Sequence, residues 1–479
     1  MKFFTDELEK TSVPLEFERM SGNLASQVGK RLASKDFGEW SQNLERVHFC
    51  SRPIRLRGSS QTVDRSTGEI LSSFGEDTPG GREIWVPCGN RRSTQCPACS
   101  RLYARDMFEM IRTGMLGGKN VPEQVRYNPT VFLTLTAPSF GNVHGKRPND
   151  KACAPRTNAK RCPHGRIISC YKRHADGDKQ LGQPLCSECY DYPSHVVWQY
   201  YSPELWRRFT IQLRRTIAQR IGVKLSKIKD SFSLQFAKVA EFQTRGCIHF
   251  HALIRVDGSK NLGEFVAAPS AVTADLLKES ALSAAQFVKV RAEPAYPGDK
   301  VRILKFGQQV DVKIVGCERS YSDRLSAEAV SGYIAKYSTK SIDESFIQGH
   351  KNAHIARLMS CIQFIGNHPH APPIYGLLRK WVKELGFRGH FATKSRAYSI
   401  TLGRLRRTRK RFRLLSQARK ATELQSLDNA SLSILLLSDE LEEELPVVIG
   451  NWEFVAAGWE NKADEVLAIA AAQAAMKYA

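Results

Sequence analysis

The chain has 479 residues and a formal net charge of +23, from 71 lysines and arginines against 48 aspartates and glutamates. This length exceeds one ordinary domain, and a hydrophobic content of 42% suffices for buried cores. No apolar run approaches the roughly 18 residues of a membrane span, and the first ten residues lack the apolar stretch of a signal peptide. We therefore expect a cytoplasmic protein whose partner is nucleic acid and not a membrane.

Cysteine usage points to bound metal. The chain holds twelve cysteines, and without a secretory signal these favour metal sites over a disulfide framework. Cys96-Pro-Ala-Cys99 places two thiolates on one tight turn. Tetrahedral zinc then needs two further ligands, for which Cys88 and Cys50 are nearest. We expect a structural zinc site here, in an N-terminal region of residues 1–125.

A second cysteine-rich stretch follows a predicted strand at residues 127–136. It is a polar insertion at about 142–200, rich in proline and glycine, and a loop of this length needs a staple such as zinc. The candidate ligands are a four-thiolate set with two histidines as substitutes: Cys162, Cys170, Cys186 and Cys189, with His164 or His174. Cys153 is left over, so we expect two structural zinc ions in the chain.

The next predicted element is an amphipathic helix. Ser202-Pro203-Glu204 has the cap, the proline and the early acid of a helix start. Apolar residues at a spacing of four run from Leu205 to Ile221, so this helix is expected to pack on a sheet while its arginines stay in solvent. With a further helix predicted at 271–287, the pattern indicates an α+β fold.

Two strands at about 231–243 and 247–256, joined by Thr244-Arg245-Gly246, predict a β-hairpin. Residues two apart on a strand share a face, so His249 and His251 point the same way while their neighbours enter a core. Glu241 would lie across from His249, and Gln243 across from Cys247. Two imidazoles with one carboxylate or amide suit Mg²⁺ or Mn²⁺. The alternative is that the two histidines only decorate the polar face of a half-buried strand.

A tyrosine pair marks the next helix. On a helix capped by Ser326, Tyr333 and Tyr337 lie one turn apart, and Lys336 and Lys340 flank them. The two phenols therefore form a stripe with a cationic border. Half-buried packing of the two rings is the alternative interpretation.

Beyond residue 346 the chain becomes strongly basic. The cations that follow residue 403 suit DNA phosphates, although such a run is also typical of a solvated surface: Arg404, Arg406, Arg407, Arg409, Lys410 and Arg411. A strand-like stretch at 447–459 and an alanine-rich helix from residue 463 end the chain. We treat residues 346–479 as a basic DNA-binding or accessory region.

Three of these elements stand in the order of the motifs of rolling-circle replication initiators, the HUH endonucleases of plasmids and single-stranded phages. Phe132–Thr136 resembles the first motif and Arg245–His251 the second. Tyr333–Tyr337 with Lys340 resembles the third. The chain is most similar to the cysteine-rich initiators of actinobacterial plasmids and integrative elements, over roughly residues 45–410. Further matching stretches are 136–141, 205–211 and 389–395.

The resemblance implies a ferredoxin-like antiparallel sheet, the HUH endonuclease core, which we expect at residues 126–345. Zinc-knuckle insertions and a mainly helical C-terminal region would complete the α+β fold. A Mg²⁺ or Mn²⁺ ion held by His249, His251 and a third ligand, best Glu241 and next Gln243, would polarise a scissile phosphate of single-stranded origin DNA. A tyrosine would attack it, leaving a 5′-phosphotyrosyl enzyme and a free 3′-OH primer.

Roles for the tyrosines and lysines also follow from the resemblance. Related initiators place a carboxylate where Tyr333 stands, so Tyr337 is expected to attack first. A phenol with a pKa near 10 is a weak nucleophile at neutral pH. The metal and the cations of Lys336 and Lys340 would favour its anion.

Partners and rival functions complete the expectations. No Walker loop is present, so unwinding would fall to host replication proteins such as a helicase. One rival is a rolling-circle transposase, which shares the zinc-rich region, the two histidines and the paired tyrosines. The other is a non-catalytic, zinc-containing DNA-binding regulator, which would bind DNA without Mg²⁺ or Mn²⁺ and would not nick it.

Overall fold

The computed structural model describes residues 22–65, 67–79, 81–93, 95–158, 160–316, 325–339, 352–418 and 447–477. The chain forms two compact units: unit 1 joins Met1–Met107 to Thr401–Ala479, and unit 2 is Phe108–Ile400. The sequence predicts boundaries at residues 125 and 345 instead. The units differ from that division because strand β12 (Val447–Ala457) pairs along the whole of β1 (Ile54–Val63), a long-range pairing with no local signal.

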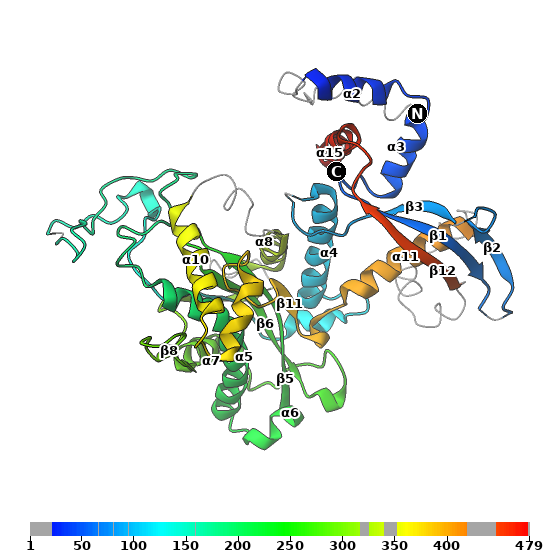
Figure 1. Ribbon diagram of the computed structural model, residues 1–479. Helices are drawn as coiled ribbons and strands as arrows, with labels where there is room; N and C mark the ends of the chain where they lie inside the picture. Colours follow the sequence, from blue (N-terminus) through cyan, green and yellow to red (C-terminus); the bar gives the residue numbers. More distant parts are fainter. Residues whose placement is uncertain are drawn as a thin grey trace. The chain divides into compact units, whose positions relative to one another are not determined.

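Unit 2 is built on a six-stranded mixed sheet (Figure 1). The neighbouring strands pair antiparallel, except for the parallel pair β10 and β9. The spatial order is β10 (Leu325–Ser326), β9 (Val310–Gly316), β4 (Thr130–Leu135), β6 (Ile248–Gly258), β5 (Phe232–Phe242) and β11 (Ala392–Lys394).

The two faces of this sheet have different neighbours. Ile248 and Phe250 of β6 are fully buried, and Trp206 of helix α5 (Tyr192–Arg220) lies 5.8 Å from Phe250 between ring centroids. Helix α7 (Ala274–Phe287) also packs on this sheet. Because side chains alternate along a strand, His249 and His251 of β6 point to the opposite face, where helix α8 (Ala327–Thr339) packs on β5.

Helix α5 starts earlier than the sequence predicts. It begins at Tyr192, capped by the Asp191 carboxylate, which accepts from the Ser194 N–H at 2.9 Å, and Pro203 lies inside it. Proline has no N–H for the carbonyl four residues back. The Ser202 hydroxyl donates to that Gln199 carbonyl at 2.8 Å instead, which is why the helix continues through Pro203.

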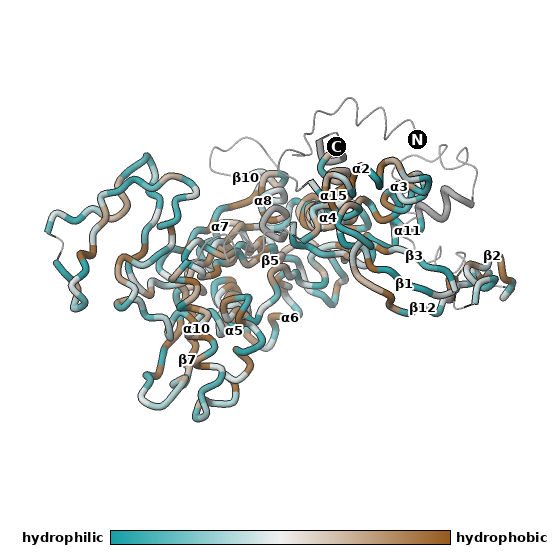
Figure 2. The backbone as a smooth tube through the Cα atoms, turned by 45° about the horizontal axis from the view of Figure 1, so that its top comes forward, coloured by the Kyte–Doolittle hydropathy of each residue, from teal (hydrophilic) through white to brown (hydrophobic). Residues whose placement is uncertain are grey.

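Shorter elements complete unit 2. The β7–β8 hairpin and helix α10 are joined to the main sheet by the same hydrophobic core. The bounds are η2 Glu123–Tyr127, η3 Pro148–Asp150, η4 Leu225–Lys227, α6 Ile228–Ser231, η5 Lys260–Leu262, β7 Val290–Ala292, β8 Arg302–Leu304, α10 Ala353–Asn367, η6 Pro373–Trp381 and η7 Arg396–Tyr398. The long loop between β4 and α5 has little regular structure (Figure 1) and mostly hydrophilic residues (Figure 2).

Unit 1 joins the two ends of the chain. Its sheet has the order β12-β1-β2, and β3 also pairs with β1. Trp459, which follows β12, packs against Trp85 and Trp40 at ring-centroid distances of 4.4 and 5.4 Å. The remaining bounds are β2 Ile70–Phe74, β3 Arg82–Val86, α2 Gly22–Leu32, α3 Phe37–Arg46, α11 Leu402–Ala418 and α15 Lys462–Lys477. Helix α4 (Pro97–Leu116) begins in unit 1, and its residues from Phe108 onward belong to unit 2.

These observations establish a mixed α+β protein with antiparallel strand pairing. Across the described parts of both units, none of the helices has the length and apolar character needed to cross a membrane.

Candidate active site

The β5–β6 hairpin has the register that the sequence predicts. Glu241 pairs with His249 across the two strands, and the Gln243 N–H donates to the Cys247 carbonyl at 2.8 Å. Gly246 takes a φ of +80° in the turn, a conformation that glycine adopts without strain. The hairpin therefore presents a carboxylate and two imidazoles on one face.

Two helices hold the turn of this hairpin in place. The Gln199 side chain of α5 donates to the Gly246 carbonyl at 3.0 Å and accepts from the Ile248 N–H at 3.1 Å. His354 of α10 lies 3.0 Å from the Arg245 carbonyl through Nε2. Because both side chains are buried, the strand that carries the histidines starts from a fixed position.

The ligand atoms of Glu241, His249 and His251 all lie within 4.8 Å of one another. The Glu241 carboxylate is 3.0 Å from His249 Nε2 and 3.2 Å from His251 Nε2, and the two Nε2 atoms are 3.0 Å apart. Two ring nitrogens and a carboxylate at these distances can all coordinate one cation. This donor set fits a divalent ion such as Mg²⁺, Mn²⁺ or zinc.

The neutral form of His251 is favoured by its surroundings. The residue is 3% exposed, and this burial lowers the pKa of His251 despite the Glu241 carboxylate beside it. Its Nδ1 lies 3.1 Å from the Thr134 hydroxyl of β4. That contact leaves Nε2 aimed at Glu241 and His249, as a metal-ligating histidine requires.

Tyr333 of helix α8 reaches the same cluster. The Ser326 hydroxyl accepts from the Ala329 N–H at 3.2 Å, so the helix starts at the predicted cap. The Tyr333 hydroxyl lies 3.3 Å from His251 Nε2, and its ring meets those of His251 and Phe132 edge to face at 5.0 and 5.6 Å. Tyr333 is 37% exposed, so part of this residue reaches solvent.

The other predicted residues of this helix are described less fully. Tyr337 lies one turn beyond Tyr333 on α8, and its side chain and that of Lys336 lie outside the described part of the structure. Lys340 lies outside the described residues altogether.

The structure does not bring Gln243 to the cluster. Its side chain accepts from the Arg245 guanidinium at 3.1 Å, and Arg245 also donates to the Ala137 and Pro138 carbonyls at 3.0 Å each. Gln243 therefore helps to fix the chain after β4, and Glu241 remains the third ligand candidate.

The N-terminal cysteines form the group that the sequence predicts. Ligand atoms of Cys50, Cys88, Cys96 and Cys99 lie within 4.8 Å of one another. The Cys50 sulfur accepts from the Cys88 N–H at 3.3 Å, and the Cys88 sulfur from the Asn90 N–H at 3.5 Å. A closed four-cysteine group of this kind is suited to structural zinc.

The insertion differs from the prediction. Cys162, Cys186 and Cys189 gather with His164, whereas Cys170 lies in a separate group with His144, Cys153 and His174. His164, one of the two histidine substitutes that the sequence allows, takes the place of Cys170 in the first group, because Cys170 pairs through its backbone with Ala154, which places it beside Cys153. Cys153 and His144 of the second group are not among the ligands that the sequence predicts. The sequence signal for two groups is that the insertion contains eight cysteines and histidines ahead of α5, enough for two four-ligand sites.

The basic run forms helix α11 of unit 1, and its cations differ in exposure. Arg406 and Arg407 are exposed, Arg404 and Arg409 are half-buried, and Arg411 is buried. Arg409 is paired with the buried Asp106 of α4. The side chain of Lys410 lies outside the described part. Arg406 and Arg407 are thus the most exposed of the described cations of this run, although Arg406 Nε also lies 4.0 Å from the Asp106 carboxylate.

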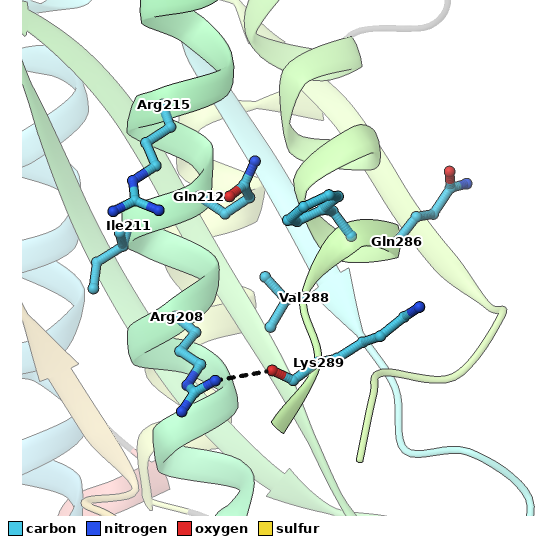
Figure 3. A pocket seen from close by; sticks show the side chains of 8 residues that line it. Arg208, Ile211, Gln212, Arg215, Gln286, Val288 and Lys289 are labelled. Atoms are coloured by element: carbon cyan, nitrogen blue, oxygen red, sulfur yellow. Dashed lines mark hydrogen bonds between the residues drawn. The ribbon is translucent and has the colours of Figure 1, made fainter. Parts of the chain in front are cut away.

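A groove of about 600 Å³ lies between α5 and α7 (Figure 3). Arg208, Arg215 and Lys289 line it beside Phe287, and the Arg208 guanidinium donates to the Lys289 carbonyl at 3.2 Å. Both helices cover the sheet face opposite the histidines, so the groove is separate from the histidine cluster.

The sequence matches a known protein family over most of its length. Residues 36–473 match the family RepSA, described as the replication initiator protein of pSAM2. The chain belongs to this family of replication initiator proteins, which supports an initiator role.

A protein of the same class, a replication initiator, is similar to this chain over most of its length. The chain is 34% identical over 447 residues to a replication initiator protein of Streptomyces ambofaciens, covering 89% of this chain and 88% of that protein. No solved structure matches the chain.

Proposed function

We propose that this chain is a rolling-circle replication initiator of the HUH type, which nicks single-stranded origin DNA through a tyrosine on α8. The observation that carries the proposal is the meeting of Glu241, His249 and His251 with the Tyr333 hydroxyl, 3.3 Å from His251 Nε2. These groups come from a central hairpin and a helix that packs on it, as a ferredoxin-like HUH core requires.

Glu241, His249 and His251 would hold Mg²⁺ or Mn²⁺. When bound, such an ion polarises a phosphoryl oxygen and offsets the charge that develops on the scissile phosphate. The protein contributes a rigid donor set, since Thr134 orients His251 and burial keeps that imidazole unprotonated. The exposed edge of Tyr333 leaves room for a DNA strand beside the cluster.

The covalent step exchanges one phosphodiester for another. The tyrosine oxygen bonds to phosphorus while the bond to the 3′ oxygen breaks. The phenol gives up its proton, and the departing 3′ oxygen takes one up. The products are a 5′-phosphotyrosyl protein and a free 3′-OH that primes synthesis.

Two tyrosines on one helix allow two such steps. Sequence resemblance favours Tyr337 for the first attack, and the contact of Tyr333 with His251 supports a direct part for Tyr333 as well. One transfer would open the origin, and the second would release the displaced strand after a round of synthesis. Lys336 and Lys340 remain the proposed cations beside the phenols.

The proposed partners are origin DNA and host replication proteins. Arg406 and Arg407 of α11 are proposed to contact phosphates. Strand displacement is assigned to a host helicase, because the sequence has no Walker loop. The family match favours replication over transposition.

The decisive experiment is incubation of the full chain with single-stranded DNA from the origin region and Mn²⁺, followed by a denaturing gel. We expect a protein–DNA adduct that disappears with a chelator and in the His249→Ala/His251→Ala variant. The Tyr333→Phe/Tyr337→Phe double variant should form none, and the two single variants assign the order of attack.

Tyr127→Phe is the matched control, since Tyr127 is a tyrosine of the same unit that is 79% exposed and should leave the adduct unchanged. An adduct that persists in the double variant would overturn the tyrosine assignment. DNA binding without any nicking, with or without Mn²⁺, would leave a zinc-containing DNA-binding regulator in place of the nickase.

A further inference from the structure

The insertion between β4 and α5 carries eight metal-binding side chains in four sequential pairs. The pairs in chain order are His144 with Cys153, Cys162 with His164, Cys170 with His174, and Cys186 with Cys189. The structure joins the first pair to the third and the second pair to the fourth. The two groups are therefore interleaved along the chain.

The group formed by the first and third pairs has the geometry of a closed site. The ligand atoms lie within 4.8 Å of one another. His144 Nδ1 is 3.2 Å from His174 Nε2. The Cys170 sulfur is 3.6 Å from His174 Nε2, and the Cys153 sulfur is 4.0 Å from His144 Nδ1. Two thiols and two imidazoles facing one point match the Cys₂His₂ sets of structural zinc.

Groups around this cluster orient its ligands. His174 has a fully buried side chain, and its Nδ1 lies 2.8 Å from the Asp178 carboxylate, which leaves Nε2 aimed at the cluster. A carboxylate behind a histidine is the usual outer partner of a zinc ligand. The Cys153 sulfur also accepts from the Gly145 N–H at 3.2 Å.

The second group lies on the other two pairs. His164 Nδ1 is 3.3 Å from the Cys189 sulfur and 3.8 Å from that of Cys186. A tight turn carries the first pair of this group, since the Cys162 N–H donates to the Arg166 carbonyl at 2.8 Å and the Gly165 N–H to the Cys162 carbonyl at 2.9 Å. Three thiols and one imidazole form a second tetrahedral set.

We propose that the insertion binds two zinc ions in a cross-braced module, one of them at the Cys₂His₂ group of His144, Cys153, Cys170 and His174. With the N-terminal cysteines, the chain then holds three structural zinc sites. The interleaving has a physical consequence: each ion closes a loop that contains ligands of the other, so neither site keeps its geometry alone. This proposal does not depend on the nicking activity.

The module is anchored at its C-terminal end to the rest of unit 2. Glu188, between the last two cysteines, pairs with Arg357 of α10 at 2.6 Å. Asp191, which caps α5, follows directly. Loss of either zinc would therefore unfold the insertion while its C-terminal end stays attached to α5 and α10. We expect the six-stranded sheet to remain folded.

The test measures zinc per chain by mass spectrometry in the His249→Ala/His251→Ala background, which removes competing binding at the histidine cluster. We expect three zinc ions in this parent and two in Cys96→Ser/Cys99→Ser. The control Cys361→Ser should keep three, because Cys361 lies in α10 outside the four groups found among the described residues. Cys153→Ser/Cys170→Ser should lose its own zinc and give up the second insertion zinc to a chelator more readily than the parent does.

Two further variants keep the proposal testable if serine variants misfold. His144→Cys should retain three zinc ions and, after Co²⁺ exchange, show a stronger thiolate-to-cobalt charge-transfer band. Asp178→Asn should bind this zinc about 10- to 100-fold more weakly, whereas Asp176→Asn, at an 86% exposed neighbour, should not.

Two results would overturn the proposal. One is a parent that holds only two zinc ions. The other is a Cys153→Ser/Cys170→Ser variant with the parent's zinc content and chelator resistance.

Discussion

Thr134 illustrates how one hydroxyl can decide the quality of the histidine cluster. Its oxygen lies 3.1 Å from His251 Nδ1, on the side of the ring away from Glu241 and His249. An outer partner of this kind fixes both the tautomer and the orientation of a ligating imidazole. Thr134 lies on β4, so a third strand orients a ligand of the cluster that β5 and β6 form.

Thr134→Val keeps the side-chain shape and removes the hydroxyl. We expect Mn²⁺ affinity, measured by titration calorimetry, to fall about 10- to 100-fold with the fold retained. Thr130→Val is the control, because Thr130 lies on the same strand opposite Arg255 and its hydroxyl donates to the Asn128 carbonyl at 3.0 Å. Equal Mn²⁺ affinity in Thr134→Val and the wild type would contradict the orienting role.

His354 predicts a pH dependence of stability. Burial, helped by the positive charge of Arg245, lowers the pKa of His354 to about 4, against about 6.5 in an unfolded chain. As the pH falls below about 6.5, the unfolded chain takes up the proton and the folded protein does not. The stability from the neutral imidazole is therefore complete above about pH 6.5 and is lost progressively toward pH 4.

The expected loss from this one residue between pH 7 and pH 5 is about 2 kcal/mol. Urea unfolding at both pH values measures it, and the loss should be smaller by about that amount in His354→Gln. His370→Gln, at an exposed histidine, should behave as the wild type does. The same loss in His354→Gln and the wild type would assign the pH effect to other groups.

At the scale of single elements, local patterns predicted what local forces determine. The hairpin register followed from strand alternation and Gly246, and the α8 start followed from Ser326, because each depends on neighbouring residues. The start of α5 did not, since Pro203 has the same local signature at a helix start and inside a helix. The deciding contact, from Ser202 to the Gln199 carbonyl, exists only once the helix has formed.

Helix α5 provides a direct test of that contact. Ser202 is fully buried, so Ser202→Ala leaves the Gln199 carbonyl without its donor and should lower the free energy of unfolding by about 1–3 kcal/mol. Adding Pro203→Ala supplies a backbone N–H to the same carbonyl. In urea unfolding, the double variant should therefore be more stable than Ser202→Ala alone; a further loss of stability would contradict this explanation.

At the scale of the whole molecule, long-range pairing limits what the sequence shows. The cysteine sets illustrate this: Cys50, Cys88, Cys96 and Cys99 were assigned by nearness along the chain, and the structure gathers the same four. In the insertion nearness failed, because the ligand pairs alternate between two groups. The predicted boundaries at residues 125 and 345 also followed the order of the chain, whereas β12 completes a sheet begun by β1.

Trp459 joins the C-terminal part of unit 1 to its candidate zinc site. Its indole Nε1 donates to the Cys50 carbonyl at 3.0 Å, and its ring packs against Trp85 and Trp40. It is 9% exposed. A residue near the end of the chain therefore supports a cluster whose ligands all come from the first hundred residues.

Trp459→Ala should destabilise unit 1 by about 3–5 kcal/mol, as for other large-to-small core changes, and zinc at the Cys50 cluster should pass to a chelator faster. The Mn²⁺ affinity of the histidine cluster in unit 2 should not change. Phe454→Ala in β12 is the control, because Phe454 is 68% exposed and its removal should alter stability by no more than about 0.5 kcal/mol. Thermal unfolding and chelator-release rates measure both effects, and unchanged zinc release in Trp459→Ala would show that the cluster is stable without the C-terminal segment.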